Sequence, residues 1–213
     1  MDLQVTRRQY EDQGIDESSL PADPISLFRD WFELAVANRP GLWFEPSAMS
    51  LATSGPNGEV TNRIVLLKNI RNEGINFFTN YDSKKGRQIR TNPRAAVIFY
   101  WPYLARQVRM VGSVERTSRE VSEDYFHSRP RGSQLGAAVS RQSSEIESRL
   151  ELDAACAELG ERYDGQPIPL PDNWGGYLLR PSRIEFWQGK TDRLHDRVEY
   201  RLEEEWRRVR LSP

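Results

Sequence analysis

The feature that most constrains the fold is a series of short segments rich in β-branched and aromatic residues, separated by turn signals such as Gly55-Pro-Asn-Gly58. Such segments are typical of strands. Their close spacing, without regular alternation with helices, favours antiparallel pairing over a doubly wound parallel sheet. The predicted strands are Ala48–Thr53, Val60–Lys68, Ile75–Thr79, Ala95–Trp101, Arg106–Thr117, Tyr177–Leu179, Ile184–Gln188, Val198–Leu202 and Trp206–Leu211. We predict a mainly β fold of the α+β class: an antiparallel barrel closed on itself, in which the second and third strands pair.

Helices are predicted to pack outside this barrel. Apolar residues recur at helical spacing over Pro24–Ala37, and Ser83 is placed to cap a helix over Lys84–Arg90. Two capping boxes, Thr117–Glu120 and Ser144–Glu147, predict further helix starts. These two helices are predicted to end near His127 and Tyr163, and Pro130 precedes a helix over Gly132–Val139.

The N-terminal stretch and the composition exclude several classes of protein. Residues 1–22 have little periodic apolar content and predict a mobile arm before one domain, 23–213. A net charge of −1 argues against bulk nucleic-acid binding, and one cysteine with two histidines argues against a metal cluster. The arm lacks the apolar core of a signal peptide, and no apolar run approaches the ~20 residues of a membrane span. We therefore expect a cytoplasmic protein that binds neither membrane nor nucleic acid.

Two charged segments are candidates for anion binding. Arg63 and Lys68 flank an apolar strand, but five residues apart they point to opposite faces, so a core strand with charged ends is the stronger interpretation. Ser83, Lys84 and Lys85 open a helix, where backbone N–H groups and the helix dipole favour a phosphate. A capped and solvated helix start is the alternative.

Hydrogen-bond donors recur in two further segments. Tyr125, Arg129 and Ser133 offer the donors that a phosphate ester needs. Spacing of four would align them on one helix, but Pro130 breaks it, so spacing alone favours a surface helix–turn–helix. Gln107, on a strand, could bind the polar edge of a heterocycle or face solvent.

The segment from Ile184 to Arg197 is the richest in functional groups. It joins an aromatic strand with Trp187, a turn, and an Arg-x-His-x-Arg run. Strand alternation would place Arg193, His195 and Arg197 on one face, where they repel one another unless an anion lies opposite. A solvated strand is the alternative to a binding site.

These segments, in this order, resemble pyridoxine 5′-phosphate oxidases from about Arg7 to Pro213. The most specific match is IEFWQGKTDRLHDR, supported by RIVLLK, FFTNYDSKKG, QVRMVGSVER, YFHSRPRGSQLGA and SRQSS. The resemblance implies an FMN-binding split β-barrel that works as a homodimer with FMN at the interface. It also implies oxidation of pyridoxine or pyridoxamine 5′-phosphate to pyridoxal 5′-phosphate, with O2 as the acceptor and H2O2 as a product.

The resemblance further implies the site residues. The residues expected to contact FMN are Arg63, Ile64, Val65, Leu66, Leu67, Lys68, Phe78, Thr79, Lys84, Lys85, Gln107, Gln142, Ser143, Trp187 and Arg197. Those expected to hold the substrate phosphate are Lys68, Tyr125, Arg129 and Ser133. Arg193, Leu194 and His195 would lie over the pyridine ring, with Arg193 and His195 as catalytic residues, and Arg7, Arg8 and Tyr10 would form a lid segment.

Three other functions compete with this one. The first is a split-barrel flavoprotein that acts on another substrate. In that case the presence of Tyr125, Arg129, Ser133, Arg193 and His195 would have no explanation. A non-catalytic carrier of FMN or pyridoxal phosphate would show the same binding residues, so only turnover separates it. A nucleic-acid-binding barrel would need an exposed aromatic and basic surface.

Overall fold

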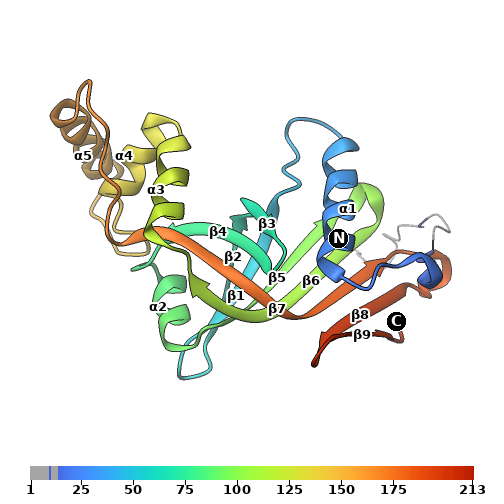
Figure 1. Cartoon of the computed structure of the whole chain (residues 1–213). Helices are drawn as coiled ribbons and strands as arrows, with labels where there is room; N and C mark the ends of the chain where they lie inside the picture. The colour runs from blue at the N-terminus through green and yellow to red at the C-terminus, as the bar shows by residue number, and fades with distance from the viewer. Residues whose placement is uncertain (1–9, 11–13) are drawn as a thin grey trace, which may run out of the picture.

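A computed structural model describes residue 10 and residues 14–213 (Figure 1). The strands are β1 (Ala48–Ser54), β2 (Val60–Leu66), β3 (Asn69–Arg71), β4 (Gly74–Asn80), β5 (Arg94–Trp101), β6 (Arg106–Arg116), β7 (Trp174–Gln188), β8 (Asp196–Leu202) and β9 (Trp206–Arg210). The α-helices are α1 (Pro24–Ala37), α2 (Lys84–Thr91), α3 (Arg119–Ser128), α4 (Arg131–Val139) and α5 (Arg149–Arg162). The predicted antiparallel, mainly β fold with flanking helices is confirmed.

The strands form one sheet in the order β2-β1-β5-β6-β7-β4-β3, and β8 pairs with β7 and with β9. This sheet is split rather than closed, because its ladder begins at β2 and ends at β3. A single bond from the Lys68 amide to the Asn76 carbonyl, 2.9 Å, spans that side. The prediction of a barrel closed on itself is therefore wrong, whereas the split barrel that the resemblance implied is confirmed.

Two predicted strand relationships are wrong. The second predicted strand, β2, pairs with β1 and not with β4, because β4 pairs on one side with the short strand β3 and on the other with β7. The predicted strands 177–179 and 184–188 are one strand, β7. It continues through Pro181 because the register shifts between Val111 and Gly112 opposite it, and such a bulge tolerates proline. Gly112 is required there, since a Cβ would lie 1.9 Å from the Arg180 carbonyl oxygen.

The core lies between one face of the sheet and α1. Phe28 of this helix is fully buried, and its ring lies 5.0 Å from that of Phe99 on β5. Trp31 packs edge-on against Phe186 of β7 at 5.2 Å. Asp23 caps the helix through the amides of residues 25 and 26, and the helix has the predicted bounds. The apolar spacing of its sequence thus selects the face that covers the sheet.

The starts of the other helices agree with their sequence-based predictions to different degrees. Ser83 caps α2 as predicted, accepting from the Gly86 amide. Helix α3 starts one residue later than its capping box indicated, because Ser118 is the cap. The Ser144–Glu147 box is not used, since Ser144 donates to the Arg141 carbonyl in a turn and α5 begins at Arg149.

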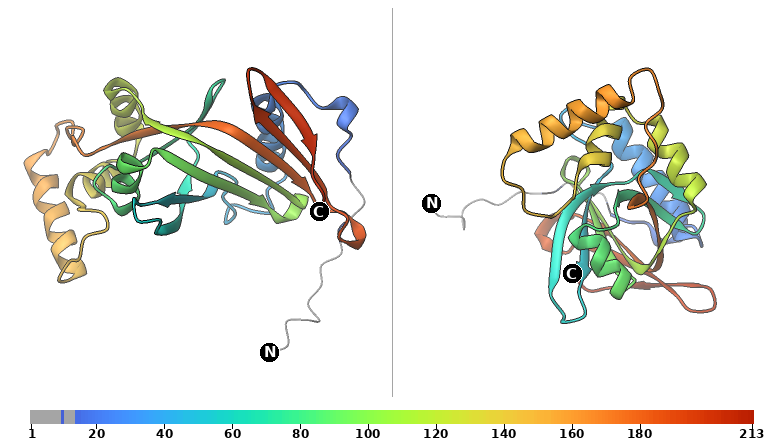
Figure 2. Two further views of the ribbon diagram at one scale, coloured as in Figure 1. Left: turned by 90° about the horizontal axis from the view of Figure 1, so that it is seen from below. Right: turned by 90° about the vertical axis from the view of Figure 1, so that its left-hand side faces the viewer.

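The two ends of the sheet carry different elements. Helices α4 and α5 extend from one end, and the β8–β9 hairpin lies at the other (Figures 1 and 2). The predicted arm, as far as it is described, lies against this hairpin from Gly14 on: the Tyr200 hydroxyl donates to the Pro21 carbonyl at 2.8 Å. Arg7 and Arg8 lie outside the described residues. Among those described, no helix has the length and apolar character needed to cross a membrane.

Candidate active site

A buried lysine lies where β4 meets α2. The Lys85 ammonium donates to Gln142 Oε1 at 2.8 Å, Thr79 Oγ1 at 3.1 Å and Ser83 Oγ at 3.3 Å. Burial, together with the charge of Arg63, lowers the pKa of Lys85 to about 8. All three acceptors are neutral, so they do not offset the charge of the ammonium. A buried cation held in this way fits the phosphate of a cofactor such as FMN.

Arg63 approaches this lysine from β2. Its guanidinium donates to the Leu51 carbonyl at 3.1 Å, to Thr53 Oγ1 at 2.7 Å and to the Thr61 hydroxyl, and burial lowers the pKa of Arg63. The inner face of β2 therefore carries the arginine, while Ile64 on the outer face is 64% exposed. The interpretation of this segment as a core strand with charged ends is wrong, because its apolar side chains do not all point inward.

The neighbouring predicted residues are arranged differently. Lys84 turns outward and pairs with Glu59 at 2.5 Å, with both side chains about half exposed. Lys68 is exposed just beyond the end of β2. Ser143 is exposed with φ of 71°, next to Gln142. The structure thus brings Lys85, Arg63, Thr79 and Gln142 together, and leaves Lys84 and Lys68 at the surface.

A second cationic group lies among stacked aromatic rings. The Phe78 and Tyr125 rings stack at 3.9 Å, Trp174 extends the stack, and the Arg129 guanidinium lies 4.8 Å from the Trp174 ring centre. Burial lowers the pKa of Arg129, and its Nη1 atom is buried without a hydrogen-bond partner. A buried guanidinium N–H without an acceptor fits an anionic ligand.

A cavity of about 290 Å³ opens beside Arg129. It is lined by Asn80, Arg129, Ser133, Gly136, Ala137, Ser140, Gln142 and Trp174. Pro130 separates α3 from α4 and Ser133 is exposed, as a surface helix–turn–helix predicts, yet Arg129 and Ser133 line the same cavity. Asn80 and Trp174 were missed from the sequence. Trp174 lies in a stretch rich in proline and glycine, residues 164–176, whose composition predicts a loop in which an aromatic residue gives no signal of its own.

Three rings meet near the end of β7. Those of Trp187 and His195 lie 4.7 Å apart, and the Tyr10 ring is edge-on to both, at 5.8 Å and 5.6 Å. The Lys190 amide donates to His195 Nδ1 at 3.1 Å, so a neutral imidazole carries its proton on Nε2. Burial and the charge of Arg193 lower the pKa of His195, which keeps the ring neutral near pH 7.

The predicted strand over Arg193 and His195 does not form. Residues Thr191–Arg193 make a 3₁₀ turn in which Asp192 and Arg193 have φ of 54° and 60°, and β8 begins only at Asp196. The prediction that Arg193, His195 and Arg197 share a strand face is therefore wrong. Arg193 is exposed, and Leu194 beside it is 69% exposed.

Arg197 is fixed by a buried carboxylate. It donates from Nε and Nη2 to Glu185 at 3.0 and 3.2 Å, and from Nη1 to the Ser212 carbonyl at 2.8 Å. The hydrogen bond to Glu185 raises the pKa of Arg197. Glu185, 4% exposed, also accepts from Arg109 at 2.6 Å. A guanidinium has five N–H groups, so Arg197 retains donors for a ligand.

The strand register places the predicted flavin contacts on two faces of the sheet. Arg63 is in line with Leu51, Val97, Met110, Ile184 and Tyr200, which form the core. The next row, Ile64, Ser50, Ile98, Arg109, Glu185 and Glu199, points outward, and Gln107, opposite Trp187, lies on that same face. Neighbours along a strand point to opposite sides. Arg63 and Gln107 therefore lie on opposite faces.

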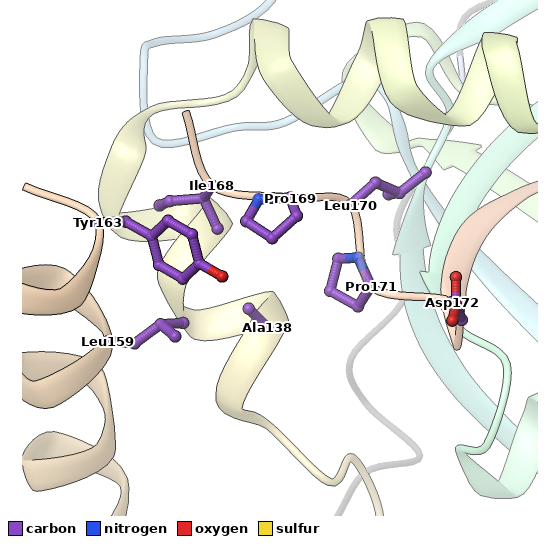
Figure 3. Close-up of a pocket in the computed structure, with 8 residues that line it drawn as sticks. All are labelled: Ala138, Leu159, Tyr163, Ile168, Pro169, Leu170, Pro171 and Asp172. Atoms are coloured by element: carbon purple, nitrogen blue, oxygen red, sulfur yellow. The ribbon is translucent and has the colours of Figure 1, made fainter. Parts of the chain in front are cut away.

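A separate cavity of about 260 Å³ lies between α4, α5 and the loop segment of residues 168–172 (Figure 3). Its lining is mostly apolar: Ala138, Leu159, Tyr163, Ile168, Pro169, Leu170, Pro171 and Asp172. None of the predicted site residues lines it.

Comparison with known proteins gives consistent matches over the chain. The pyridoxamine 5′-phosphate oxidase sequence profile matches residues 41–163, and the pyridoxine 5′-phosphate oxidase C-terminal dimerisation region matches 174–213. Pyridoxine/pyridoxamine 5′-phosphate oxidases of Rubrobacter xylanophilus and Rhodopirellula baltica are 53% and 50% identical, covering 100% and 97% of this chain and 97% and 95% of theirs.

Solved structures share the fold. PhzG from Burkholderia lata, crystallised with tetrahydrophenazine-1-carboxylic acid, is 28% identical with a TM-score of 0.89, covering 96% of this chain and 100% of its own. A pyridoxamine 5′-phosphate oxidase-related FMN-binding protein from Nostoc punctiforme is 21% identical with a TM-score of 0.71, covering 87% and 97%.

Proposed function

This chain belongs to the pyridoxamine 5′-phosphate oxidase family, and we propose that it oxidises pyridoxine or pyridoxamine 5′-phosphate to pyridoxal 5′-phosphate with FMN as its cofactor. Relatives about half identical over the full chain carry this activity in their names. The observation that carries the proposal is two cations without anionic partners among the described residues: the buried Lys85, and Arg129, whose Nη1 atom is buried without a hydrogen-bond partner. Two phosphate sites are what a reaction between FMN and a phosphorylated substrate requires.

We further propose a homodimer with FMN at the interface. The match to a dimerisation region supports the homodimer. The outer face of the sheet bears the exposed apolar residues Ile64, Leu66 and Tyr100, at 64%, 37% and 48% exposure. A second copy on this face would bury them, which favours association.

This dimer would also bring together the predicted FMN contacts that lie on opposite faces of the sheet. One protomer would supply Arg63 and Lys85 to the phosphate, and its partner would supply Gln107, Trp187 and Arg197 to the flavin. The elements that carry the substrate groups are divided in the same way, with α3 and α4 at one end of the fold and the start of β8 at the other (Figure 2). A dimer that packs unlike ends together would complete both sites.

The protein groups would act by binding and orientation. Arg129, Ser133 and Tyr125 would hold the substrate phosphate, which fixes C4′ in place. The Nε2–H of neutral His195 would donate to the C4′ hydroxyl or amine, and Arg193 would favour negative charge developing on the ring. Bound FMN would supply the hydride acceptor and pass two electrons to O2, giving H2O2. The amine substrate also consumes water and releases ammonia.

The activity is tested with purified protein, FMN and pyridoxamine 5′-phosphate in air, following the aldehyde by absorbance alongside peroxide. Equal amounts of both over many turnovers are expected. Bound flavin without turnover on either the amine or the alcohol would refute the oxidase, and would indicate a carrier or an enzyme with another substrate.

The interface is tested with Ile64→Asp, which buries a charge if the outer face is covered. The variant is expected to sediment as a monomer and to lose FMN, although Lys85 and Trp187 are intact. Leu150→Asp on α5, where the leucine is 75% exposed, is the matched control and should remain dimeric. A monomeric Ile64→Asp that binds FMN as before would refute the shared site.

A further inference from the structure

A buried aspartate joins the N-terminal segment to the C-terminal hairpin. Asp196, 7% exposed, accepts from the Ile15 amide through Oδ2 at 2.8 Å and from Arg210 Nη1 through Oδ1 at 2.6 Å. Arg210 also pairs with Glu17. Burial by itself would raise the pKa of Asp196, but the Ile15 amide and Arg210 outweigh it and lower the pKa. The carboxylate is therefore ionised and uses one oxygen for each partner.

The anchored segment leads directly to Tyr10. Four residues lie between Tyr10 and Ile15, so their Cα atoms, five steps apart along the chain, can be at most about 18 Å from each other. Tyr10 packs against Gly189, where a Cβ would lie 2.8 Å from the tyrosine ring and 3.1 Å from the Ala105 side chain. The position next to His195 and Trp187 is thus available only because residue 189 has no side chain.

We propose that Asp196 is a positioning residue: by holding Ile15 and Arg210 it anchors the N-terminal segment and keeps Tyr10 packed against His195 and Trp187. Its kinetic consequence rests on the proposed function, while the anchor itself does not. The edge of Tyr10 covers the two rings on one side, which limits the access of water to the imidazole that would contact the substrate. Asp196 touches none of the reacting groups and acts through Tyr10.

The anchor is tested by amide hydrogen exchange on the FMN-loaded protein. Asp196→Asn puts an NH2 group toward one of the two donors, so one of the two bonds is lost. Exchange in a peptide covering residues 14–20 should rise about tenfold, as expected for one hydrogen bond to a charged group. Asp172→Asn is the matched control: this aspartate also pairs with an arginine, but its side chain is 95% exposed, and exchange at 14–20 should not change.

Kinetics separate positioning from a structural role. Asp196→Asn and Tyr10→Ala should each raise KM for pyridoxamine 5′-phosphate about fivefold with unchanged FMN content, and the double variant should be no worse than either single one. Tyr10→Ala should leave exchange at 14–20 unchanged. Additive effects of the two substitutions would overturn the coupling, and unchanged exchange in Asp196→Asn would overturn the anchor. Because exchange needs no turnover, an inactive wild-type protein would refute the function without deciding the anchor.

Discussion

Replacing Lys85 by methionine should have opposite effects with and without FMN. The pKa of Lys85 falls from 10.5 to about 8. At about 1.36 kcal/mol per unit, carrying this charge in the fold at pH 7 costs about 3 kcal/mol when no anion is bound. Methionine keeps most of the apolar stem and removes the charge. The contact of Lys85 with Ser83, at 3.3 Å, is longer than a usual hydrogen bond and is left out. After allowing about 1 kcal/mol for each hydrogen bond lost to Thr79 or Gln142, we expect the FMN-free variant to be about 1 kcal/mol more stable at pH 7.

The dependence on pH follows from the direction of the shift. A base whose pKa is lowered in the fold destabilises it fully below the folded pKa, and this penalty disappears as the pH rises to the unfolded value. The charge penalty that Lys85→Met removes should therefore be complete below pH 8 and vanish near pH 10.5, where the lost hydrogen bonds should leave the variant less stable than the parent. Thermal unfolding of the FMN-free proteins at pH 7 and pH 10.5 measures it.

With FMN present the order should reverse. The phosphate loses a hydrogen bond to a charged group, worth about 1.5–3 kcal/mol, so FMN affinity should fall about 10- to 150-fold in a flavin fluorescence titration. Lys84→Met is the control, because its exposed pair with Glu59 should change stability by less than about 1 kcal/mol. An FMN-free Lys85→Met that is less stable than the parent at pH 7 would refute the reasoning, since Lys85 would then be a structural hydrogen-bonding residue.

Three further substitutions test the site and its supports. Arg129→Lys loses the buried Nη1 and should raise KM for pyridoxamine 5′-phosphate about tenfold in steady-state assays; an unchanged KM would contradict the phosphate assignment. Glu185→Gln leaves Arg109 and Arg197 without their shared carboxylate and should destabilise the fold by about 3 kcal/mol in urea; a loss under 1 kcal/mol would show that solvent screens the pair. Gly86→Ala places a Cβ 2.1 Å from the Tyr81 carbonyl oxygen, so Tm and FMN affinity should fall together. A fall in Tm alone would show that the position of α2 does not determine FMN binding.

The sequence predicted local elements better than their partners. The bounds of α1 followed from apolar spacing and a proline at its first turn, both of which are local signals. Strand positions followed from β-branched and aromatic residues. Pairing did not, because β7 pairs with β4, β6 and β8, and its pairing with β6 contains a bulge that no local pattern marks. The exposed Ile64 also conflicts with the burial expected of an apolar residue.

For the site, the sequence supplied residue types while geometry came only from the fold. Resemblance to a family pointed to Lys85, Arg129 and Trp187. Within the part of the chain that the structure describes, the buried Lys85 and the half-buried Arg129 have no anionic partner. The turn at Asp192 and Arg193 was missed because left-handed backbone is uncommon outside glycine, and alternation therefore favoured a strand. The individual roles of the site residues stay predictions, as does a cytoplasmic location.

The division of the flavin contacts between two faces of one sheet has a genetic consequence. In the proposed dimer, neither copy of the chain supplies all the residues of an FMN pocket. A gene altered at Lys85 and another altered at Trp187 would each encode an inactive product when expressed alone. When the two genes are co-expressed, their products would form heterodimers. In each heterodimer one FMN pocket would contain both altered residues and the other would contain neither. Two recessive alleles of the same locus would thus complement each other, whereas alleles altered at Lys85 and Arg63 would not.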